Sequence, residues 1–344
     1  MIKTALVGFG FSANTFHVPF LSAISEFAIS AVVSSKPEQV AQRLPKAACF
    51  DDLSTLLTQQ TPDLVVITTP NHLHYQHVKQ ALEAGCHVLV EKPFVTNSRD
   101  GLELAELAKQ KGLVLCPYHN RRWDGDFLTL KGLHLAGELG DIKVMHSSFN
   151  RYRPEVRQRW RELPGEGAGI LYDLGSHLID QALHLLGEPN AVSASCRALR
   201  PGSETTDYFQ VTLHYPDKEV ILSSSPYRSG TTERFVVHGE KATFSTVGLD
   251  IQEEQLRAGL MVTVSGFGEQ AYQGMLEVGD SVTPDPLTLE DGQYHRLFDG
   301  LAQAITNDQP SPVCPISTSK VIYAIELAQT SSDTGTRQPW QFQD

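Results

Sequence analysis

Residues 1–10 read MIKTALVGFG, an apolar run that leads directly into a Gly-x-Gly turn. This order is typical of the first strand, turn and helix of a dinucleotide-binding fold. Gly8 permits the tight turn, Gly10 lets a pyrophosphate approach the backbone, and Ala13 lets the helix pack closely on the strand. The free N–H groups at the start of that helix attract anions. The same glycine pattern also occurs in turns that bind no ligand. The predicted phosphate-binding turn comprises Gly8, Gly10, Phe11, Ser12 and Ala13.

The expected second strand, residues 27–33, ends in Ser34, Ser35 and Lys36. A fold that prefers NAD usually carries an Asp or Glu here, about 20 residues after the glycine turn, to bind the ribose 2′-hydroxyl. No acid stands at this spacing, and two hydroxyls with an ammonium group suit a 2′-phosphate instead. The sequence therefore predicts NADP in preference to NAD. Two alternatives stay open: this strand end binds no ligand, or Arg43 also reaches the phosphate.

The composition is that of an ordinary globular protein, because 41% of the 344 residues are hydrophobic and 20% are charged. The net charge of −12 argues against a nucleic-acid partner, which requires a basic footprint. No apolar run reaches membrane-spanning length and no signal peptide precedes the first strand, so we expect a cytoplasmic protein without a membrane partner. The five cysteines form no CxxC pair and no metal-ligand spacing, which predicts reduced thiols and no metal site.

The first third of the chain alternates strands with helices, and this alternation predicts a doubly wound parallel sheet over residues 1–120. Residues 64–69 are a continuous apolar run, as a buried parallel strand requires. Further strands are expected at 87–90 and 113–116, and helices at 40–44, 51–58, 74–84 and 98–111. Because ligands bind outside the carboxyl ends of such strands, we expect one crevice to contain residues 69–71, 91–93 and 119–121.

The remainder of the chain, residues 121–344, predicts an α/β domain with a large, mostly antiparallel open sheet. Its strands follow one another without intervening helices and are bounded by Gly, Pro and Asp. The expected strands are 142–150, 191–198, 208–215, 220–225 and 232–238, and the expected helices are 126–136, 170–186, 294–306 and 318–329. Residues 247–286 are Gly-rich and irregular, and the pattern assigns them no elements.

The helix expected at residues 170–186 is apolar around most of its circumference and should be buried. Asp173, His177, Asp180 and His184 recur along one face at i, i+4, i+7 and i+11. Unpaired buried polar groups are unfavourable, so this stripe must face partners, water or a ligand. It is either an acid/base stripe, a hydrogen-bonded structural stripe or a rim that faces solvent.

Lys92 follows the expected strand at residues 87–90 and precedes Pro93. A lysine at such a position is either an exposed charge or a functional group at the nicotinamide side of the crevice. Lysines near apolar surroundings shift their pKa readily and serve as acids, bases and polarising cations. The neighbouring Glu91 is the expected ion-pair partner.

Taken in order, the motifs resemble those of the glucose–fructose oxidoreductase and inositol dehydrogenase (Gfo/Idh/MocA) family over essentially the whole chain. The segments 118–124, 151–156 and 160–162 resemble its NADP-dependent scyllo-inositol dehydrogenase branch. The motifs are Gly8-Phe9-Gly10, Thr69-Pro70-Asn71 with His74, Glu91-Lys92-Pro93 and Asp173-Leu174-Gly175-Ser176-His177.

This resemblance implies a Rossmann domain, a second domain whose sheet mediates oligomerisation, and oxidation of a secondary alcohol in a small sugar or polyol. It implies that Lys92 is the catalytic lysine, His177 the acid/base, and Asp173 its companion one turn earlier. Residues implied to bind substrate are Lys92, Asn120, Arg153, Asp173 and His177. Besides the phosphate-binding turn and residues 34–36, residues implied to bind cofactor are Thr69, Pro70, Asn71, His74, Glu91, Lys92, Asn120, Trp160 and Arg161.

Two classes of function stay open at this point. The first is an NADP-dependent dehydrogenase of a cyclitol or sugar, assembled as a homodimer or homotetramer. The second is a non-catalytic protein of the same fold that senses a dinucleotide. The joint presence of Lys92, Asp173 and His177 favours the enzyme, because a sensor has no need of an acid/base set. One further feature of the sequence is an arginine-rich stretch over residues 151–161. It comprises Arg151, Arg153, Arg157, Arg159 and Arg161. We expect some of these arginines to bind hydroxyl groups of the ligands and the others to form ion pairs.

Overall fold

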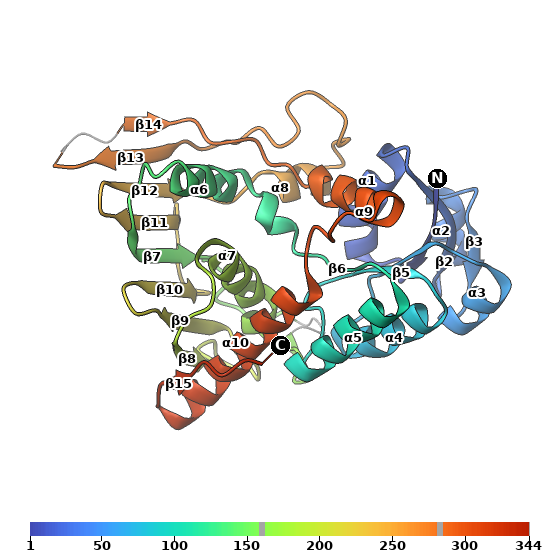
Figure 1. The fold of residues 1–344 in the computed structure, drawn as a ribbon, viewed down its shortest axis with the longest axis horizontal. Coiled ribbons are helices and arrows are strands. Elements are labelled where there is room, and N and C mark those ends of the chain that lie inside the picture. Colours follow the sequence, from blue (N-terminus) through green and yellow to red (C-terminus); the bar gives the residue numbers. More distant parts are fainter. Residues whose placement is uncertain (158–161, 281–284, 344) are drawn as a thin grey trace. The chain divides into compact units, whose positions relative to one another are not determined.

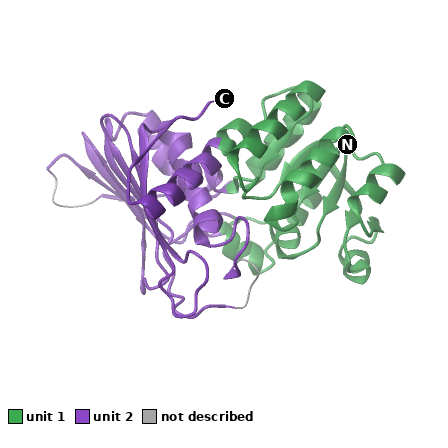
Figure 2. Cartoon of the chain, turned by 90° about the horizontal axis from the view of Figure 1, so that it is seen from below, with its two compact units in different colours: residues 1–120, 252–267, 294–319 green, residues 121–251, 268–293, 320–344 purple. Residues whose placement is uncertain are grey.

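The computed structural model describes residues 1–157, 162–280 and 285–343, and the chain divides into two compact units (Figure 2). The sequence predicted one domain boundary, between residues 120 and 121, and this boundary remains a prediction. The compact units are more complex, because the first unit also includes two later segments of the chain. Unit 1 comprises residues 1–120, 252–267 and 294–319, and unit 2 comprises residues 121–251, 268–293 and 320–344.

Unit 1 is built on a six-stranded parallel sheet in the order β3-β2-β1-β4-β5-β6, as expected for a Rossmann domain. Helices cover both faces of the sheet (Figure 1), which is why the central strands β1, β4 and β5 are mostly apolar, and β4 is fully buried along its length. The strands are β1 Ile2–Val7, β2 Phe27–Val33, β3 Ala48–Phe50, β4 Leu64–Ile67, β5 His87–Val90 and β6 Leu115–Pro117.

The helices of unit 1 follow the sequence signals closely. Pro37 occupies the first turn of α2, where its missing N–H has no consequence, so α2 begins three residues earlier than predicted. The Asp52 side chain caps α3 by accepting the Thr55 N–H at 2.8 Å. The elements are η1 Ala13–His17, α1 Val18–Ala23, α2 Pro37–Arg43, α3 Leu53–Gln59, η2 Asn71–Leu73, α4 His74–Glu83, α5 Ser98–Lys111, α8 Gln252–Arg257 and α9 His295–Asn307.

Unit 2 is built on a nine-stranded sheet in the order β14-β13-β12-β11-β7-β10-β9-β8-β15. Neighbouring strands are antiparallel except β7 and β10, which are parallel. This confirms the expected mostly antiparallel sheet. The strands are β7 Ile142–Ser148, β8 Ala191–Arg197, β9 Tyr208–His214, β10 Glu219–Ser224, β11 Glu233–Gly239, β12 Ala242–Val247, β13 Gly274–Val278, β14 Asp285–Leu287 and β15 Gln338–Pro339.

The helices of unit 2 lie on one face of this sheet (Figure 2). Strand β10 shows the consequence, because Val220 and Leu222 are buried toward the helices while Ile221 points the other way and is half-buried. The elements on that side are η3 Asn120–Trp123, α6 Gly125–Leu135, η5 Leu171–Gly175, α7 Ser176–Leu186 and α10 Pro315–Thr334, of which η3 and α10 begin in unit 1.

The structure differs informatively from the sequence prediction in two stretches of the chain. The helix expected over residues 170–186 begins as a π-helical turn, η5, before it becomes α-helical at Ser176. Such i→i+5 turns have no distinctive periodicity in the sequence and recur at functional sites. In the stretch 247–286, which had no assigned elements, the structure contains α8, β13 and the start of β14.

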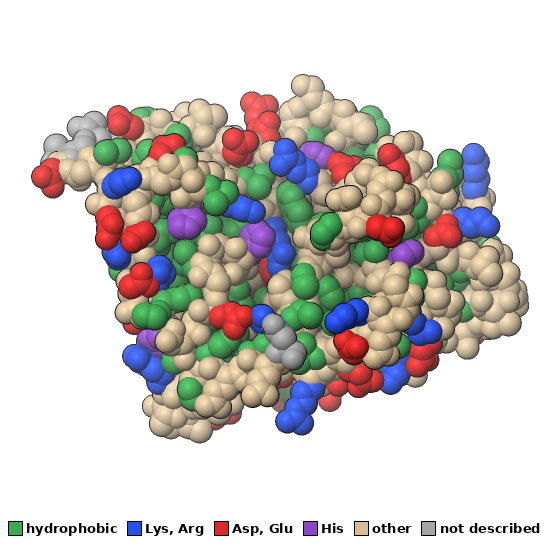
Figure 3. Space-filling view, in the orientation of Figure 1, with side chains coloured by type: hydrophobic (Ala, Val, Ile, Leu, Met, Phe, Trp, Pro, Cys, Tyr) green, Lys and Arg blue, Asp and Glu red, His purple; other side chains and the backbone are tan. Residues whose placement is uncertain are grey.

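The hydropathy of the helices and the distribution of surface charge complete the description of the fold. Among the residues that the structure describes, every helix is too short or too polar to cross a bilayer. On the face drawn in Figure 3, acidic and basic side chains are interspersed with apolar and polar ones.

The open face of the second sheet carries one continuous uncharged row across six strands. The backbone register pairs neighbouring members of this row in the order Thr212, Ile221, His146, Val236, Ser245 and Met275. We predict that this face pairs with a second copy of the chain, because the helices cover only the opposite face and this row includes the partly exposed apolar residues Ile221, Val236 and Met275.

We therefore expect the protein to sediment as a dimer or tetramer at micromolar concentration. Ile221→Lys should shift it toward the monomer, because the substitution places a charge within the row. Leu135→Lys is the matched control, since Leu135 is 74% exposed at the end of α6. A stable wild-type monomer would contradict the prediction.

Candidate cofactor and catalytic site

A cavity of about 380 Å³ lies at the carboxyl edge of the first sheet, where β1, β2, β3 and β4 end. Ligands of doubly wound folds bind at this edge, beside the point where the strand order reverses. The predicted cofactor residues that the structure brings together around this cavity are Gly8, Gly10, Ser34, Ser35, Lys36 and Thr69.

The two glycines fit the predicted phosphate-binding turn for different reasons. Gly8 has a φ of +93°, and a Cβ there would lie 2.9 Å from the Thr68 hydroxyl, so only glycine fits without strain. At Gly10 a Cβ would meet nothing within 4 Å, which leaves the backbone open on that side. The open backbone is the feature that a pyrophosphate requires, so these residues fit a dinucleotide.

The end of the cavity that is predicted to hold the ribose contains side chains of both charges. Lys36 lines it beside Ser34, whose hydroxyl accepts the Lys36 backbone N–H at 3.0 Å. Asp51 and Asp52 also line the cavity, from the end of β3. The Asp52 carboxylate is committed to the Thr55 cap, and that bond lowers its pKa. The sequence analysis included these acids only in the helix expected over residues 51–58 and gave them no ligand role, because β3, which precedes them, was not expected.

Glu91 connects the loop that carries Lys92 to the phosphate-binding turn. One carboxylate oxygen of Glu91 accepts hydrogen bonds from the Ser12 hydroxyl and from His17 Nε2, the latter at 2.9 Å. The other oxygen accepts the backbone N–H of Lys92 at 3.1 Å. His17 is fully buried, and Glu91 is nearly so. Glu91 is therefore more than the ion-pair partner of Lys92 that the sequence suggested.

These contacts keep Glu91 ionised in a buried position. Burial alone would raise its pKa, but the hydrogen bond and charge of His17, the Ser12 hydroxyl and the charge of Lys92 outweigh burial. The net effect lowers the pKa of Glu91 from 4.5 to about 2. The residue that precedes Lys92 in the chain therefore carries a negative charge at every physiological pH.

His74 joins the loops that follow β4 and β5. Its Nε2 lies 2.8 Å from the Thr69 carbonyl oxygen, and its Nδ1 lies 2.8 Å from the Pro93 carbonyl oxygen. The ring is fully buried. Burial lowers the pKa of His74, while the two carbonyls and the charge of Glu91 oppose the shift. His74 therefore supports the site by holding these two loops together.

The predicted acid/base pair lies in unit 2, at the junction of a π-helical and an α-helical turn. Asp173 belongs to η5 and is half-buried, and His177 belongs to the first turn of α7 and is 5% exposed. The Asp173 N–H donates at 3.2 Å to the carbonyl of Gly169, just before the π-helical turn. A histidine side chain at such a position can act as a general base toward a bound alcohol.

The other half of the predicted polar stripe has structural partners. Arg122 donates two hydrogen bonds to Asp180, at 2.9 and 2.6 Å. Lys131 donates to His184 Nε2 at 3.0 Å. Burial, followed by the charge of Arg122, lowers the pKa of His184 to about 4, so this ring remains neutral. The structural interpretation of the stripe thus holds for Asp180 and His184.

The remaining predicted residues are placed only in part. Asn71 begins η2 and Asn120 begins η3, and both side chains are buried. The Arg153 backbone N–H donates to the Pro226 carbonyl at 2.7 Å. Residues 158–161, which include Arg159 and the predicted ligand residues Trp160 and Arg161, lie outside the described residues.

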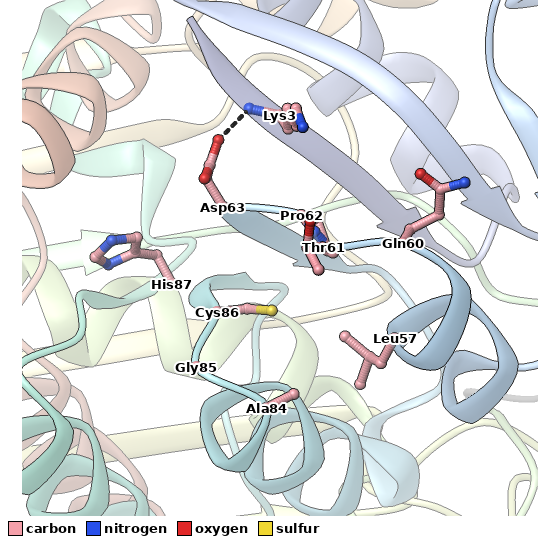
Figure 4. A pocket seen from close by; sticks show the side chains of 10 residues that line it. All are labelled: Lys3, Leu57, Gln60, Thr61, Pro62, Asp63, Ala84, Gly85, Cys86 and His87. Atoms are coloured by element: carbon pink, nitrogen blue, oxygen red, sulfur yellow. Dashed lines mark hydrogen bonds between the residues drawn. The ribbon is translucent and has the colours of Figure 1, made fainter.

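A second cavity, of about 350 Å³, opens at the amino edge of the same sheet (Figure 4). It lies before β4 and β5, and the Lys3 backbone N–H donates to Asp63 across one side at 2.7 Å. Because ligands of this fold class bind at the opposite edge, this cavity is not part of the candidate site. Its lining residues are Lys3, Leu57, Gln60, Thr61, Pro62, Asp63, Ala84, Gly85, Cys86 and His87.

Comparison with known proteins covers nearly the whole chain. The family model described as an oxidoreductase family, NAD-binding Rossmann fold, matches residues 2–119, and its C-terminal alpha/beta domain model matches residues 134–340. The scyllo-inositol 2-dehydrogenase (NADP(+)) IolW of Bacillus subtilis (strain 168) is 39% identical, over 96% of this chain and 94% of that protein. The D-glucoside 3-dehydrogenase of Escherichia coli (strain K12) is 30% identical over 58% of each.

Solved structures agree with these matches. The Bacillus subtilis protein yvaA superposes with a TM-score of 0.95 at 37% identity, over 99% of both chains. The Yersinia pestis protein YPO2259 gives a TM-score of 0.94 at 38% identity, over 100% of this chain and 98% of that one. The expected fold class is confirmed, and so is the expected enzyme class, a nicotinamide dinucleotide-dependent dehydrogenase acting on CH–OH groups.

The buried Glu91 carboxylate predicts a specific pH dependence of stability. Its pKa is lowered on folding, so its contribution is present above pH 4.5 and is lost as the pH falls toward 2. The loss below pH 4.5 is about 1.4 kcal/mol per pH unit. We expect Glu91→Gln to be less stable than wild type at neutral pH, and the difference to shrink on acidification.

Urea unfolding of both proteins at several pH values between 7 and 3.5 measures this difference. Glu83→Gln is the matched control, because Glu83 is an exposed carboxylate of the same unit. The prediction fails if the wild type and Glu91→Gln lose stability in parallel throughout this range.

Proposed function

The chain belongs to the Gfo/Idh/MocA oxidoreductase family, and on that premise we propose that it is an NADP-dependent dehydrogenase of a cyclitol or sugar. The reaction interconverts a secondary alcohol and its ketone. The observation that carries this proposal is the contact of Glu91 with Ser12 and His17, because it joins the loop of Lys92 to the dinucleotide-binding turn.

The proposed mechanism assigns one task to each of three residues. When bound, the nicotinamide ring supplies the hydride acceptor. His177 accepts the proton of the substrate hydroxyl, since an imidazole is the natural base near neutral pH. Lys92 stabilises the negative charge that develops on the reacting oxygen. Asp173 holds a neighbouring substrate hydroxyl or orients the imidazole.

The substrate proposal is supported by the relatives. IolW carries the name of a scyllo-inositol 2-dehydrogenase and aligns over nearly the whole chain. The D-glucoside 3-dehydrogenase aligns over little more than half. We therefore propose scyllo-inositol or a stereoisomer as the first substrate to test, followed by aldohexoses. A steady-state screen of inositol isomers and aldohexoses with NADP and NAD tests the assignment, and turnover of none of them would reject it.

The cofactor proposal gives a direct substitution test. NADP preference is supported by the two hydroxyls and the ammonium group of Ser34, Ser35 and Lys36, which line one cavity. Ser35→Asp should shift preference toward NAD, because a carboxylate repels the 2′-phosphate and binds a 2′-hydroxyl. The ratio of kcat/KM for NADP and NAD measures the change. Ser35→Asn, of the same size without charge, should keep most of the preference, and equal efficiency with both cofactors in the wild type would reject NADP selectivity.

The catalytic proposal predicts a loss of turnover without a loss of cofactor binding. Lys92→Ala and His177→Ala should each lower kcat by ~10²–10⁴-fold. The affinity for NADP, measured by fluorescence titration, should stay close to normal, since neither residue is assigned to the adenosine or the pyrophosphate. Lys109→Ala and His295→Ala are matched controls on exposed side chains. Nearly full turnover in either variant would show that the residue has another role.

A further inference from the structure

Residues 252–267, here called the strap, belong to unit 1 although the chain enters and leaves them from unit 2. The strap is anchored at both ends. Gln252 is fully buried, and its side-chain oxygen accepts the Tyr294 N–H at 2.8 Å. At the other end the Phe267 ring meets the buried Phe20 ring edge-on, with centroids 6.1 Å apart. The strap is therefore an ordered part of the Rossmann unit.

The strap places an arginine beside the predicted phosphate-binding turn. The Arg257 guanidinium lies over the Phe11 ring, 5.1 Å from its centroid. Phe11 in turn packs edge-on against Phe16 at 5.9 Å. Glu253, one turn earlier in α8, forms an ion pair with Arg257 at 2.7 Å. The side chain of Arg257 is half exposed, so it is oriented by these contacts and still accessible.

The charges around the predicted phosphate-binding turn explain why a cation beside Phe11 would favour the binding of a pyrophosphate. Residues 8–14 contain no Lys or Arg, and Ser12 contacts the ionised carboxylate of Glu91. A helix start offers the equivalent of roughly half a positive charge, whereas a pyrophosphate carries about two negative ones. The turn thus lacks charge for its ligand, and Arg257 is positioned beside it from a distant part of the chain.

We propose that Arg257 binds the pyrophosphate of the dinucleotide and that the strap is a cofactor-binding element. A guanidinium is well suited to this task, because it is always charged and its planar donors match phosphate oxygens. Phe11 and Glu253 hold the side chain in place, so less rotamer freedom is lost on binding. This assignment rests on the proposed function, because it requires that the chain bind a dinucleotide.

The test compares Arg257→Ala and Arg257→Lys with wild type by calorimetric titration. The ligands are NADP, NAD, 2′-phospho-ADP-ribose and adenosine 2′-monophosphate, of which only the last lacks a pyrophosphate. We expect Arg257→Ala to weaken binding of the first three by about 10-fold or more and to leave the last unchanged. Arg257→Lys should fall between. Arg296→Ala, on an exposed arginine of the same unit, should bind all four as wild type does.

The possible outcomes separate this assignment from the function on which it rests. If wild type and Arg257→Ala bind 2′-phospho-ADP-ribose equally, the role of Arg257 is refuted while the proposed function stands. An equal loss for adenosine 2′-monophosphate would place Arg257 at the adenosine end and refute the pyrophosphate assignment. If the wild type binds no dinucleotide, the proposed function itself fails. Arg257→Lys keeps the charge and serves as the second variant if the alanine variant is unstable.

Discussion

A single buried carboxylate, that of Glu91, constrains the candidate site in unit 1. A charge taken out of water is stable only where hydrogen-bond donors replace its hydration. Ser12, His17 and the Lys92 N–H supply those donors. Because Ser12 belongs to the glycine turn, His17 to η1 and Lys92 to the loop after β5, the carboxylate fixes these segments together. His74 extends the same arrangement to the loop after β4.

Unit 2 contains a comparable constraint around the helix of His177. Gln181, one turn after His177, donates to the Arg121 carbonyl at 2.6 Å and accepts from Arg234, and it is fully buried. Arg122 pairs with Asp180 on the same helix. Removing one member of such a network leaves a buried charge without its partner, which is strongly unfavourable. The helix is therefore held by polar contacts on one side and by apolar packing on the others.

The sequence was informative wherever a local pattern has a local cause. Continuous apolar runs predicted β4 and β5, and the glycine turn predicted the start of a Rossmann unit, as the strand order confirms. Sequence patterns did not predict contacts between side chains that are distant in the chain. The contact between His17 and Glu91 spans 74 positions, and nothing near either residue announces it. The stripe from Asp173 to His184 divided into two parts for the same reason, since Arg122 and Lys131 lie outside the helix.

The distribution of charge makes the same point about function. The net charge of −12 excludes little about an anionic cofactor, because a ligand responds to the groups within a few ångströms and solvent screens the rest. Lys36 and Arg257 are the cations proposed to contact the 2′-phosphate and the pyrophosphate, and they come from the end of β2 and from the strap. Asp51 and Glu91 place negative charge beside the same two regions. Under these proposals, recognition of the 2′-phosphate and of the pyrophosphate depends on the two local cations, which a count over the whole chain does not register.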